Sequence, residues 1–104
     1  MAEVIWSEQA ENQLRRAVQY IAAEQGTFYA RIVSESILKA VDTLEDFPRS
    51  GQIEPLLRFK KAEYRYIVAW SYKIVYRLGK NKVVVARVFH TSQNPSKLTR
   101  ARTK

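Results

Sequence analysis

The first half of the chain repeats apolar positions with the period of a helix. Two sets of apolar side chains recur at three- and four-residue spacing, namely Ala10, Leu14, Ala17, Val18 and Ile21, and then Val33, Ile37, Ala40, Leu44 and Phe47. Ser7 supplies an N-cap oxygen for the first helix, and Gly26 can end it in a left-handed conformation. Thr27 can then cap the second helix, which we expect to end at Pro48. The short connection predicts an antiparallel helical hairpin.

Strand-like patterns flank this hairpin. Residues 2–6 form a short apolar run, and residues 64–70, 72–78 and 82–90 are rich in aromatic and β-branched side chains. Residues 79–81 read as a hairpin loop, whereas residues 52–62 are ambiguous because Pro55 limits strand pairing. The unbroken run Val83–Val84–Val85 predicts a strand covered on both faces. The order predicts an α+β fold: an N-terminal strand, an antiparallel helical hairpin, and a mainly antiparallel sheet of three further strands.

Composition limits the class of protein. A chain of 104 residues predicts a single domain. Residues 91–104 are polar and basic, and we expect them to form a tail that can be flexible. The absence of cysteine excludes disulfides and thiolate zinc sites, and the three glycines form neither a P-loop nor a dinucleotide-binding fingerprint. We expect neither a metal nor a cofactor. The N-terminus lacks the pattern of a secretory signal, and no apolar run approaches the ~20 residues that span a bilayer. We therefore expect a cytoplasmic protein with no membrane partner.

Charge is divided unequally along the chain. Residues 1–48 carry four basic and eight acidic side chains, whereas residues 49–104 carry fourteen basic side chains and only two acidic ones, Glu54 and Glu63. The basic side chains are distributed through the predicted strands. A surface of this kind attracts polyanions, which indicates a nucleic-acid or nucleoprotein target.

Strand alternation selects the candidate residues. In residues 72–78, Lys73 and Arg77 share one face, and Arg65 and Arg87 can join them there from flanking strands. Neighbouring cations repel each other, so such a cluster indicates an anionic partner. The alternative is an ordinary solvated face, partly neutralised by Glu54 or Glu63. His90, the single histidine, could act as an acid or base or simply form a local hydrogen bond.

Four segments, in order and at the right spacing, resemble the RelE/ParE superfamily of toxins from bacterial type II toxin–antitoxin systems. They are residues 44–48 (Leu-Glu-Asp-Phe-Pro) with Gly51, residues 64–66 (Tyr-Arg-Tyr), residues 71–77 (Ser-Tyr-Lys-Ile-Val-Tyr-Arg) and residues 88–95 (Val-Phe-His-Thr-Ser-Gln-Asn-Pro). The resemblance covers nearly the whole chain. It implies a compact α+β toxin that a cognate antitoxin wraps and neutralises.

The superfamily divides by target. RelE-like members cut mRNA on the ribosome without metal, and Arg65 and Lys73 match two of their basic positions. Ile67 replaces a second basic residue, Ser92 or Gln93 replaces a late arginine, and the C-terminal aromatic residue is missing. The alternative of a ribosome-dependent endoribonuclease therefore depends on Arg65, Lys73, Arg77 and His90 as catalytic candidates.

ParE-like members, which block DNA gyrase, resemble this chain better in the helical hairpin, the Phe-Pro-x-x-Gly turn and the histidine-containing end. They often carry an arginine where Ser92 stands. The resemblance therefore favours a non-enzymatic gyrase inhibitor, with Arg65, Lys73, Arg77 and Arg87 binding the target or its nucleic acid. An inactive or merely DNA-binding relative is a third possibility.

Overall fold

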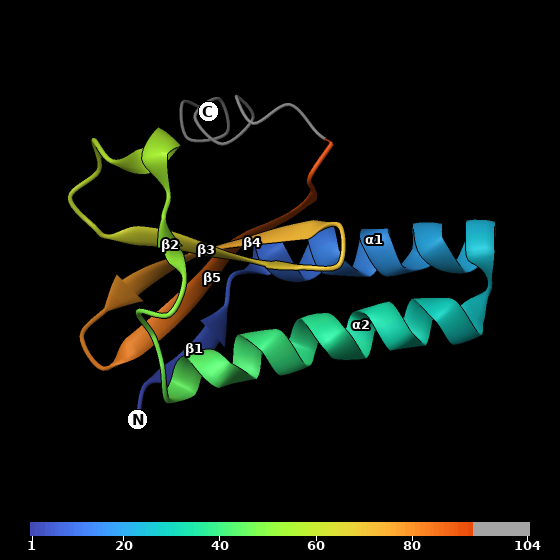
Figure 1. Ribbon diagram of the computed structural model, residues 1–104, viewed down its shortest axis with the longest axis horizontal. Helices are drawn as coiled ribbons and strands as arrows, with labels where there is room; N and C mark the ends of the chain where they lie inside the picture. The colour runs from blue at the N-terminus through green and yellow to red at the C-terminus, as the bar shows by residue number, and fades with distance from the viewer. Residues whose placement is uncertain (93–104) are drawn as a thin grey trace.

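The computed structural model describes residues 1–92, in which a helical hairpin packs on one face of a five-stranded sheet (Figure 1). The elements in chain order are β1 (Glu3–Trp6), α1 (Glu8–Gln25), α2 (Thr27–Asp42), a 3-10 turn (Thr43–Glu45), β2 (Gln52–Ile53), a second 3-10 turn (Pro55–Leu57), β3 (Tyr64–Ala69), β4 (Tyr72–Gly79) and β5 (Lys82–His90). The expected basic tail falls, from residue 93 onward, outside the described residues.

The strands are ordered β1-β5-β4-β3-β2 across the sheet. β1 pairs in parallel with β5, and all the other neighbours are antiparallel. This arrangement confirms the predicted α+β fold and its mainly antiparallel sheet. The two-residue strand β2, which was not expected, comes from the ambiguous segment and pairs with Arg65 and Tyr66 of β3.

The helix termini follow the sequence signals in part. Ser7 caps α1 as predicted, since its Oγ accepts a hydrogen bond from the Ala10 N–H at 3.0 Å. Gly26 ends α1 with φ at 98°, a conformation that L side chains rarely adopt. The expected cap by Thr27 is wrong: Thr27 is already helical, and no side chain caps α2.

The second helix ends earlier than its apolar pattern predicts. α2 stops at Asp42, and a 3-10 turn then places Leu44 in the core beneath Tyr76 and Val83. Phe47 is therefore not part of a helical core face, and 65% of it is exposed. The chain must turn here to reach β2, which a continued helix would prevent.

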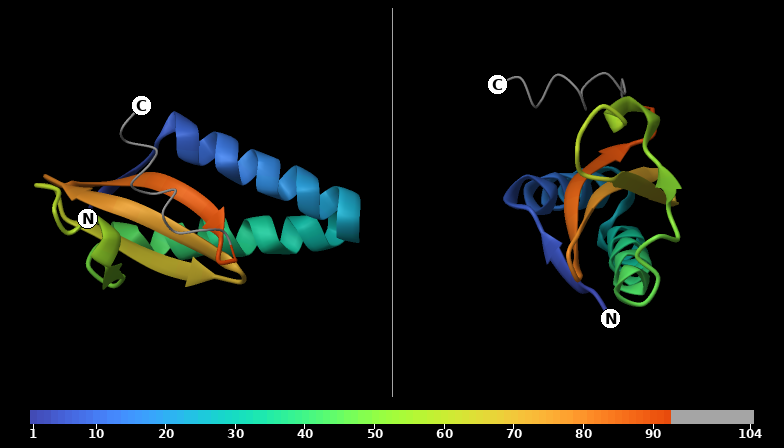
Figure 2. Two further views of the ribbon diagram at one scale, coloured as in Figure 1. Left: turned by 90° about the horizontal axis from the view of Figure 1, so that it is seen from above. Right: turned by 90° about the vertical axis from the view of Figure 1, so that its left-hand side faces the viewer.

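The main core lies between the helices and the sheet (Figure 2). Ala10 and Ile21 of α1 pack against β4 and β5 as the helical spacing predicts, and so do Val33 and Ile37 of α2. The other two buried residues of α2, Ala30 and Val41, were not predicted.

Val85 points into the main core and Val83 into the neighbouring cluster with Leu44 and Tyr76 on the same face. Val84 lies on the other face of the sheet and is only partly buried. The expectation that the valine run is fully covered is thus wrong for Val84.

We call the sheet face beneath the helices the helix face and the opposite one the outer face. The segment from β2 to β3 crosses part of the outer face (Figure 2). There Leu57 packs on Val75 beside Tyr64, Tyr66 and Phe89. This second, smaller core covers one part of the outer face. The side chains that remain accessible on that face are the ones available to a partner.

Candidate functional site

Strand pairing decides which of the predicted cations share a face. Residues directly opposite each other in an antiparallel pair point to the same side. Lys73 is opposite Val68 and Arg77 is opposite Tyr64, whereas Arg65 is opposite Tyr76, which belongs to the helix-face core. Lys73 and Arg77 therefore share the outer face as predicted. The expectation that Arg65 joins them is wrong, because its place in β3 directs it to the helix face.

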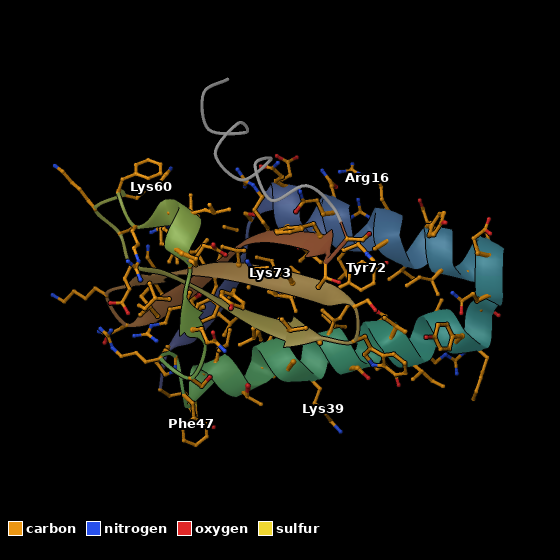
Figure 3. The ribbon with its side chains drawn as sticks, turned by 45° about the horizontal axis from the view of Figure 1, so that its top comes forward. Arg16, Lys39, Phe47, Lys60, Tyr72 and Lys73 are labelled. Atoms are coloured by element: carbon orange, nitrogen blue, oxygen red, sulfur yellow. The ribbon has the colours of Figure 1, made fainter. Side chains whose placement is uncertain are left out.

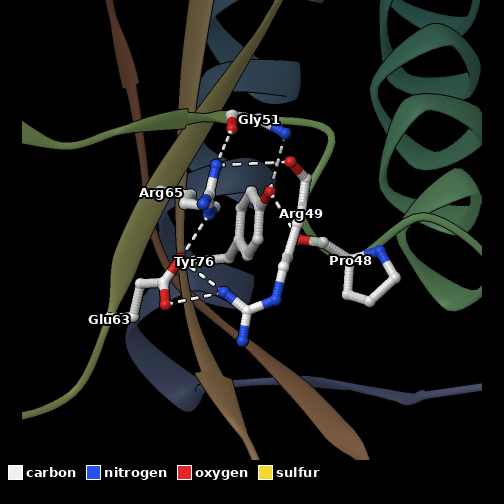
Figure 4. A network of polar contacts seen from close by, with 6 residues as sticks. All are labelled: Pro48, Arg49, Gly51, Glu63, Arg65 and Tyr76. Carbon is white, nitrogen blue, oxygen red and sulfur yellow. Dashed lines mark hydrogen bonds and ion pairs between the residues drawn. The ribbon is translucent and has the colours of Figure 1, made fainter.

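Arg65 is held inside the protein by three acceptors (Figure 4). Its Nε donates to Glu63 Oε2 at 2.6 Å, and its Nη1 donates to the carbonyl oxygens of Gly51 at 2.6 Å and Arg49 at 3.3 Å. Arg49 also donates to both Glu63 oxygens, at 2.8 and 2.9 Å. The hydrogen bonds from Arg49 and Arg65 hold the pKa of Glu63 below its ordinary value of 4.5.

The same network fixes the Phe-Pro-x-x-Gly turn (Figure 4). The buried Tyr76 hydroxyl donates to the Pro48 carbonyl at 2.8 Å and accepts the Gly51 N–H at 3.0 Å. Burial raises the pKa of Tyr76 above its ordinary value of 10.0. A Cβ on Gly51 would lie 2.5 Å from the Tyr66 carbonyl oxygen, so only glycine fits. The motif residues thus serve to attach the loop to the sheet.

Lys73 is also engaged within the protein. Its Nζ lies 2.8 Å from Glu54 Oε1 and 4.1 Å from the centre of the Tyr66 ring, a cation–π distance. The Glu54 side chain is fully buried, and its Oε2 accepts the Leu56 N–H at 3.1 Å as the cap of the second 3-10 turn. Figure 3 shows Lys73 over the middle of the sheet. The charge of Lys73 is therefore already balanced by a buried carboxylate, which weakens its attraction for an incoming phosphate.

Arg77 and Arg87 are the two predicted cations that remain without a carboxylate. Within residues 1–92, neither forms an ion pair with an aspartate or glutamate. Arg87 is opposite Val75, so it shares the outer face with Arg77. Its Nη1 donates to the Ala86 carbonyl at 2.9 Å, and both arginines are partly exposed. The predicted outward cluster therefore contains two accessible guanidinium groups.

His90 lies away from this pair. It is opposite Tyr72 on the helix face, and the two rings meet edge-to-face at 5.3 Å between centroids. Its Nδ1 accepts the Ser92 N–H at 3.0 Å and lies 2.7 Å from Ser92 Oγ. These contacts match the local hydrogen-bonding role that was the alternative to acid–base chemistry.

The catalytic candidates do not converge. Arg65 and His90 share the helix face, but their partners Tyr76 and Tyr72 are four residues apart on β4. At the rise of a β-strand this corresponds to about 13 Å along the sheet. Lys73 and Arg77 lie on the opposite face. One scissile phosphate could not contact all four groups at once.

Sequence reasoning gave Glu54 and Glu63 only the general role of neutralising some cations. Each turns out to be the specific partner of a predicted functional residue. Glu54 and Glu63 are the only acids after residue 48, which was a signal, but their positions in the sequence do not show which cation each binds.

Residues 1–92 contain no group of three or more side chains suited to holding a metal ion. Neither α1 nor α2 combines the length and apolar character of a membrane-spanning helix.

One protein family matches most of the chain. The family described as "ParE toxin of type II toxin-antitoxin system, parDE" matches residues 4–95. The chain is also similar to a solved structure described as "Chromosomal ParDE TA system from P. aeruginosa", with a TM-score of 0.72 and 16% sequence identity over 86% of this chain and 96% of that chain. At this identity the likeness is one of fold. No curated protein matches the chain.

Proposed function

Because the chain belongs to the ParE toxin family of type II toxin–antitoxin systems, we propose that it arrests growth by binding and inhibiting DNA gyrase, and that a cognate antitoxin neutralises it. The inhibition is stoichiometric binding and involves no bond cleavage. The fold that this chain shares with a ParDE toxin–antitoxin system of P. aeruginosa supports the antitoxin as a partner.

The observation that carries the proposal is the engagement of Arg65 and Lys73 within the protein. A metal-independent ribonuclease needs accessible cations to stabilise the charge that develops on the scissile phosphate. Arg65 is held by Glu63 at 2.6 Å, and Lys73 by the buried Glu54 at 2.8 Å. Both cations already have a structural task. This arrangement favours a toxin that acts by binding over a RelE-like ribonuclease acting on ribosome-bound mRNA.

The net positive charge of residues 49–92, which include β2 to β5, supports a target that carries DNA. Ten basic and two acidic side chains occur in residues 49–92. A basic surface increases the rate of encounter with a polyanion, and it can orient the toxin on a gyrase–DNA complex. Binding of this kind needs accessible cations but no precise catalytic geometry, which agrees with the separation of the candidates across both faces.

The test is a supercoiling assay with purified gyrase and relaxed plasmid. We expect increasing toxin to abolish supercoiling at a near-stoichiometric ratio, and prior addition of the antitoxin encoded beside the toxin gene to restore it. Translating ribosomes given the same toxin should keep their mRNA intact. Normal supercoiling at saturating toxin, together with mRNA cleavage on ribosomes, would instead establish the ribonuclease.

A further inference from the structure

A β-bulge determines the direction of Arg87. Val75 is opposite Arg87 and Tyr76 is opposite Val85, so Ala86 is an extra residue on β5 without a partner on β4. In a regular strand, Arg87 would lie on the same face as Val83 and Val85, which are buried against the helices. The bulge reverses the alternation and turns Arg87 to the outer face. Bulges often re-aim a side chain next to a functional site.

The bulge thereby brings two like charges together. Arg87 is opposite Val75, and Arg77 lies two residues further along β4 on the same face. Diagonal neighbours of this kind have Cα atoms roughly 7–8 Å apart. The two arginines are diagonal rather than directly opposite, so one extended anionic partner can reach both guanidinium groups. The pair thus has the character of a binding site rather than of a structural contact.

Within residues 1–92, no carboxylate forms an ion pair with Arg77 or Arg87. Glu54 binds Lys73, and Glu63 binds Arg49 and Arg65. Glu3 of β1 is opposite Lys82 on the outer face and forms no ion pair with either arginine. Residues 93–104 cannot supply a carboxylate side chain either, because they contain four basic side chains and no acidic one. The donor set itself favours carboxylate or phosphate, which a guanidinium binds through two parallel hydrogen bonds.

The surroundings of the pair favour a peptide over a nucleic acid. Val84, directly opposite Arg77, and Phe89, which follows Arg87 on the same face, are both only partly buried. Ile5 of β1 continues this apolar strip beside Val84. A phosphate backbone offers charge but little apolar surface, whereas a peptide can offer carboxylates flanked by apolar side chains.

We propose that Arg77 and Arg87 form a binding site for an extended acidic segment of the antitoxin, with two carboxylates at alternate positions. This inference rests on the proposed function, since it assigns a surface to the neutralising partner. Residues i and i+2 of an extended peptide lie about 6.6–6.8 Å apart on one side. That spacing is close to the roughly 7–8 Å between the Cα atoms of diagonal strand neighbours, so each carboxylate can bind one guanidinium. Apolar side chains at the next alternate positions lie on the same side of the peptide and can contact Val84 and Phe89.

The experiment compares antitoxin binding by calorimetry for the wild-type toxin and four variants. Arg77→Gln and Arg87→Gln should each weaken binding by about 10- to 100-fold, as expected for a lost charged hydrogen-bond pair. Arg87→Lys keeps the charge but not the two-pronged geometry, and it should lose an intermediate amount. The matched control is Arg31→Gln with Lys39→Gln, two exposed cations of α2, which should change binding by less than about 3-fold.

The possible results distinguish a failure of the site at Arg77 and Arg87 from a failure of the proposed neutralisation by an antitoxin. Unchanged antitoxin affinity in both glutamine variants, with thermal unfolding like that of the wild type, overturns the site. The site also fails if these variants keep antitoxin affinity but lose binding to a 20-base-pair DNA duplex, because the pair then contacts nucleic acid. If the wild-type toxin itself does not bind the antitoxin, the proposed neutralisation fails and the site fails with it.

Discussion

At the scale of single residues, the ion pair between Lys73 and Glu54 shows how a predicted functional cation can become a structural one. Glu54 is fully buried, and it both caps the second 3-10 turn and lies 2.8 Å from Lys73 Nζ. A buried carboxylate without its cation is strongly destabilising, whereas neutralising both partners is much less so. The pair therefore fixes the segment between β2 and β3 on the outer face.

Lys73→Met should destabilise the fold by about 3 to 5 kcal/mol, because it leaves the charge of Glu54 buried and unpaired. Lys73→Met combined with Glu54→Gln should recover most of this loss, since the glutamine oxygen can still accept the Leu56 N–H. Urea denaturation of the two variants measures the difference. A loss below about 1 kcal/mol in Lys73→Met alone would mean that the pair has no structural role.

The Tyr76 hydroxyl is the second residue with an internal task. Tyr76→Phe should cost about 1 to 3 kcal/mol, because it leaves the Gly51 N–H and the Pro48 carbonyl without their partner. Tyr66→Phe is the matched control, since its hydroxyl bonds only to the exposed Gln52 side chain. Chemical denaturation at neutral pH should show the loss for Tyr76 and almost none for Tyr66.

Tyr76 also predicts a dependence on alkaline pH. Burial raises the pKa of Tyr76 above 10.0, so the folded state holds the proton more tightly than the unfolded state. The stability linked to this group is complete below pH 10 and is lost as the pH rises through the folded pKa. Burial raises the pKa of Tyr72 in the same direction. Tyr76→Phe should therefore reduce the alkaline loss of stability, as measured by thermal melts between pH 9 and 11, without abolishing it.

At the scale of elements, the loop between α2 and β2 is attached to the sheet through Glu63. Arg49 and Arg65 lower the pKa of Glu63 below 4.5, so the folded state releases the proton more easily than the unfolded state. The stabilisation is present above about pH 4.5 and is lost as the pH falls through the folded pKa. Glu63→Gln should therefore lower the melting temperature at pH 7 but match the wild type at strongly acidic pH. An equal difference at both pH values would contradict the role of these ion pairs.

The elements themselves were largely predictable, but the direction of their side chains was not. Helical spacing and the Ser7 and Gly26 signals identified α1 and the start of the hairpin, because these are local properties of the chain. The face taken by Arg65 depends on its pairing with Tyr76, and that of Arg87 depends on an unpaired Ala86. Neither follows from local pattern. The sequence therefore predicted the four longer strands and the shared face of Lys73 and Arg77, but it missed β2 and placed Arg65 on the wrong face.

At the scale of the whole molecule, the uneven charge of the sequence becomes a difference between layers. The helical hairpin lies in the acidic first half of the chain, and the four strands from β2 to β5 lie in the basic second half (Figure 1). The cations of this basic half divide into Arg65 and Lys73, which pair with carboxylates of the fold, and Arg77 and Arg87, which form no ion pair within residues 1–92. This division is the central claim, since it assigns stability to the first pair and partner binding to the second.

The most direct test of this division is gyrase inhibition by the variant that combines Lys73→Met with Glu54→Gln. We expect this protein to fold, to inhibit supercoiling at a concentration within about 3-fold of the wild type and to leave mRNA on translating ribosomes intact, because its lost cation serves only the fold. If the variant folds but no longer inhibits supercoiling, or if the wild type cleaves ribosome-bound mRNA and the variant does not, Lys73 acts directly on the target instead.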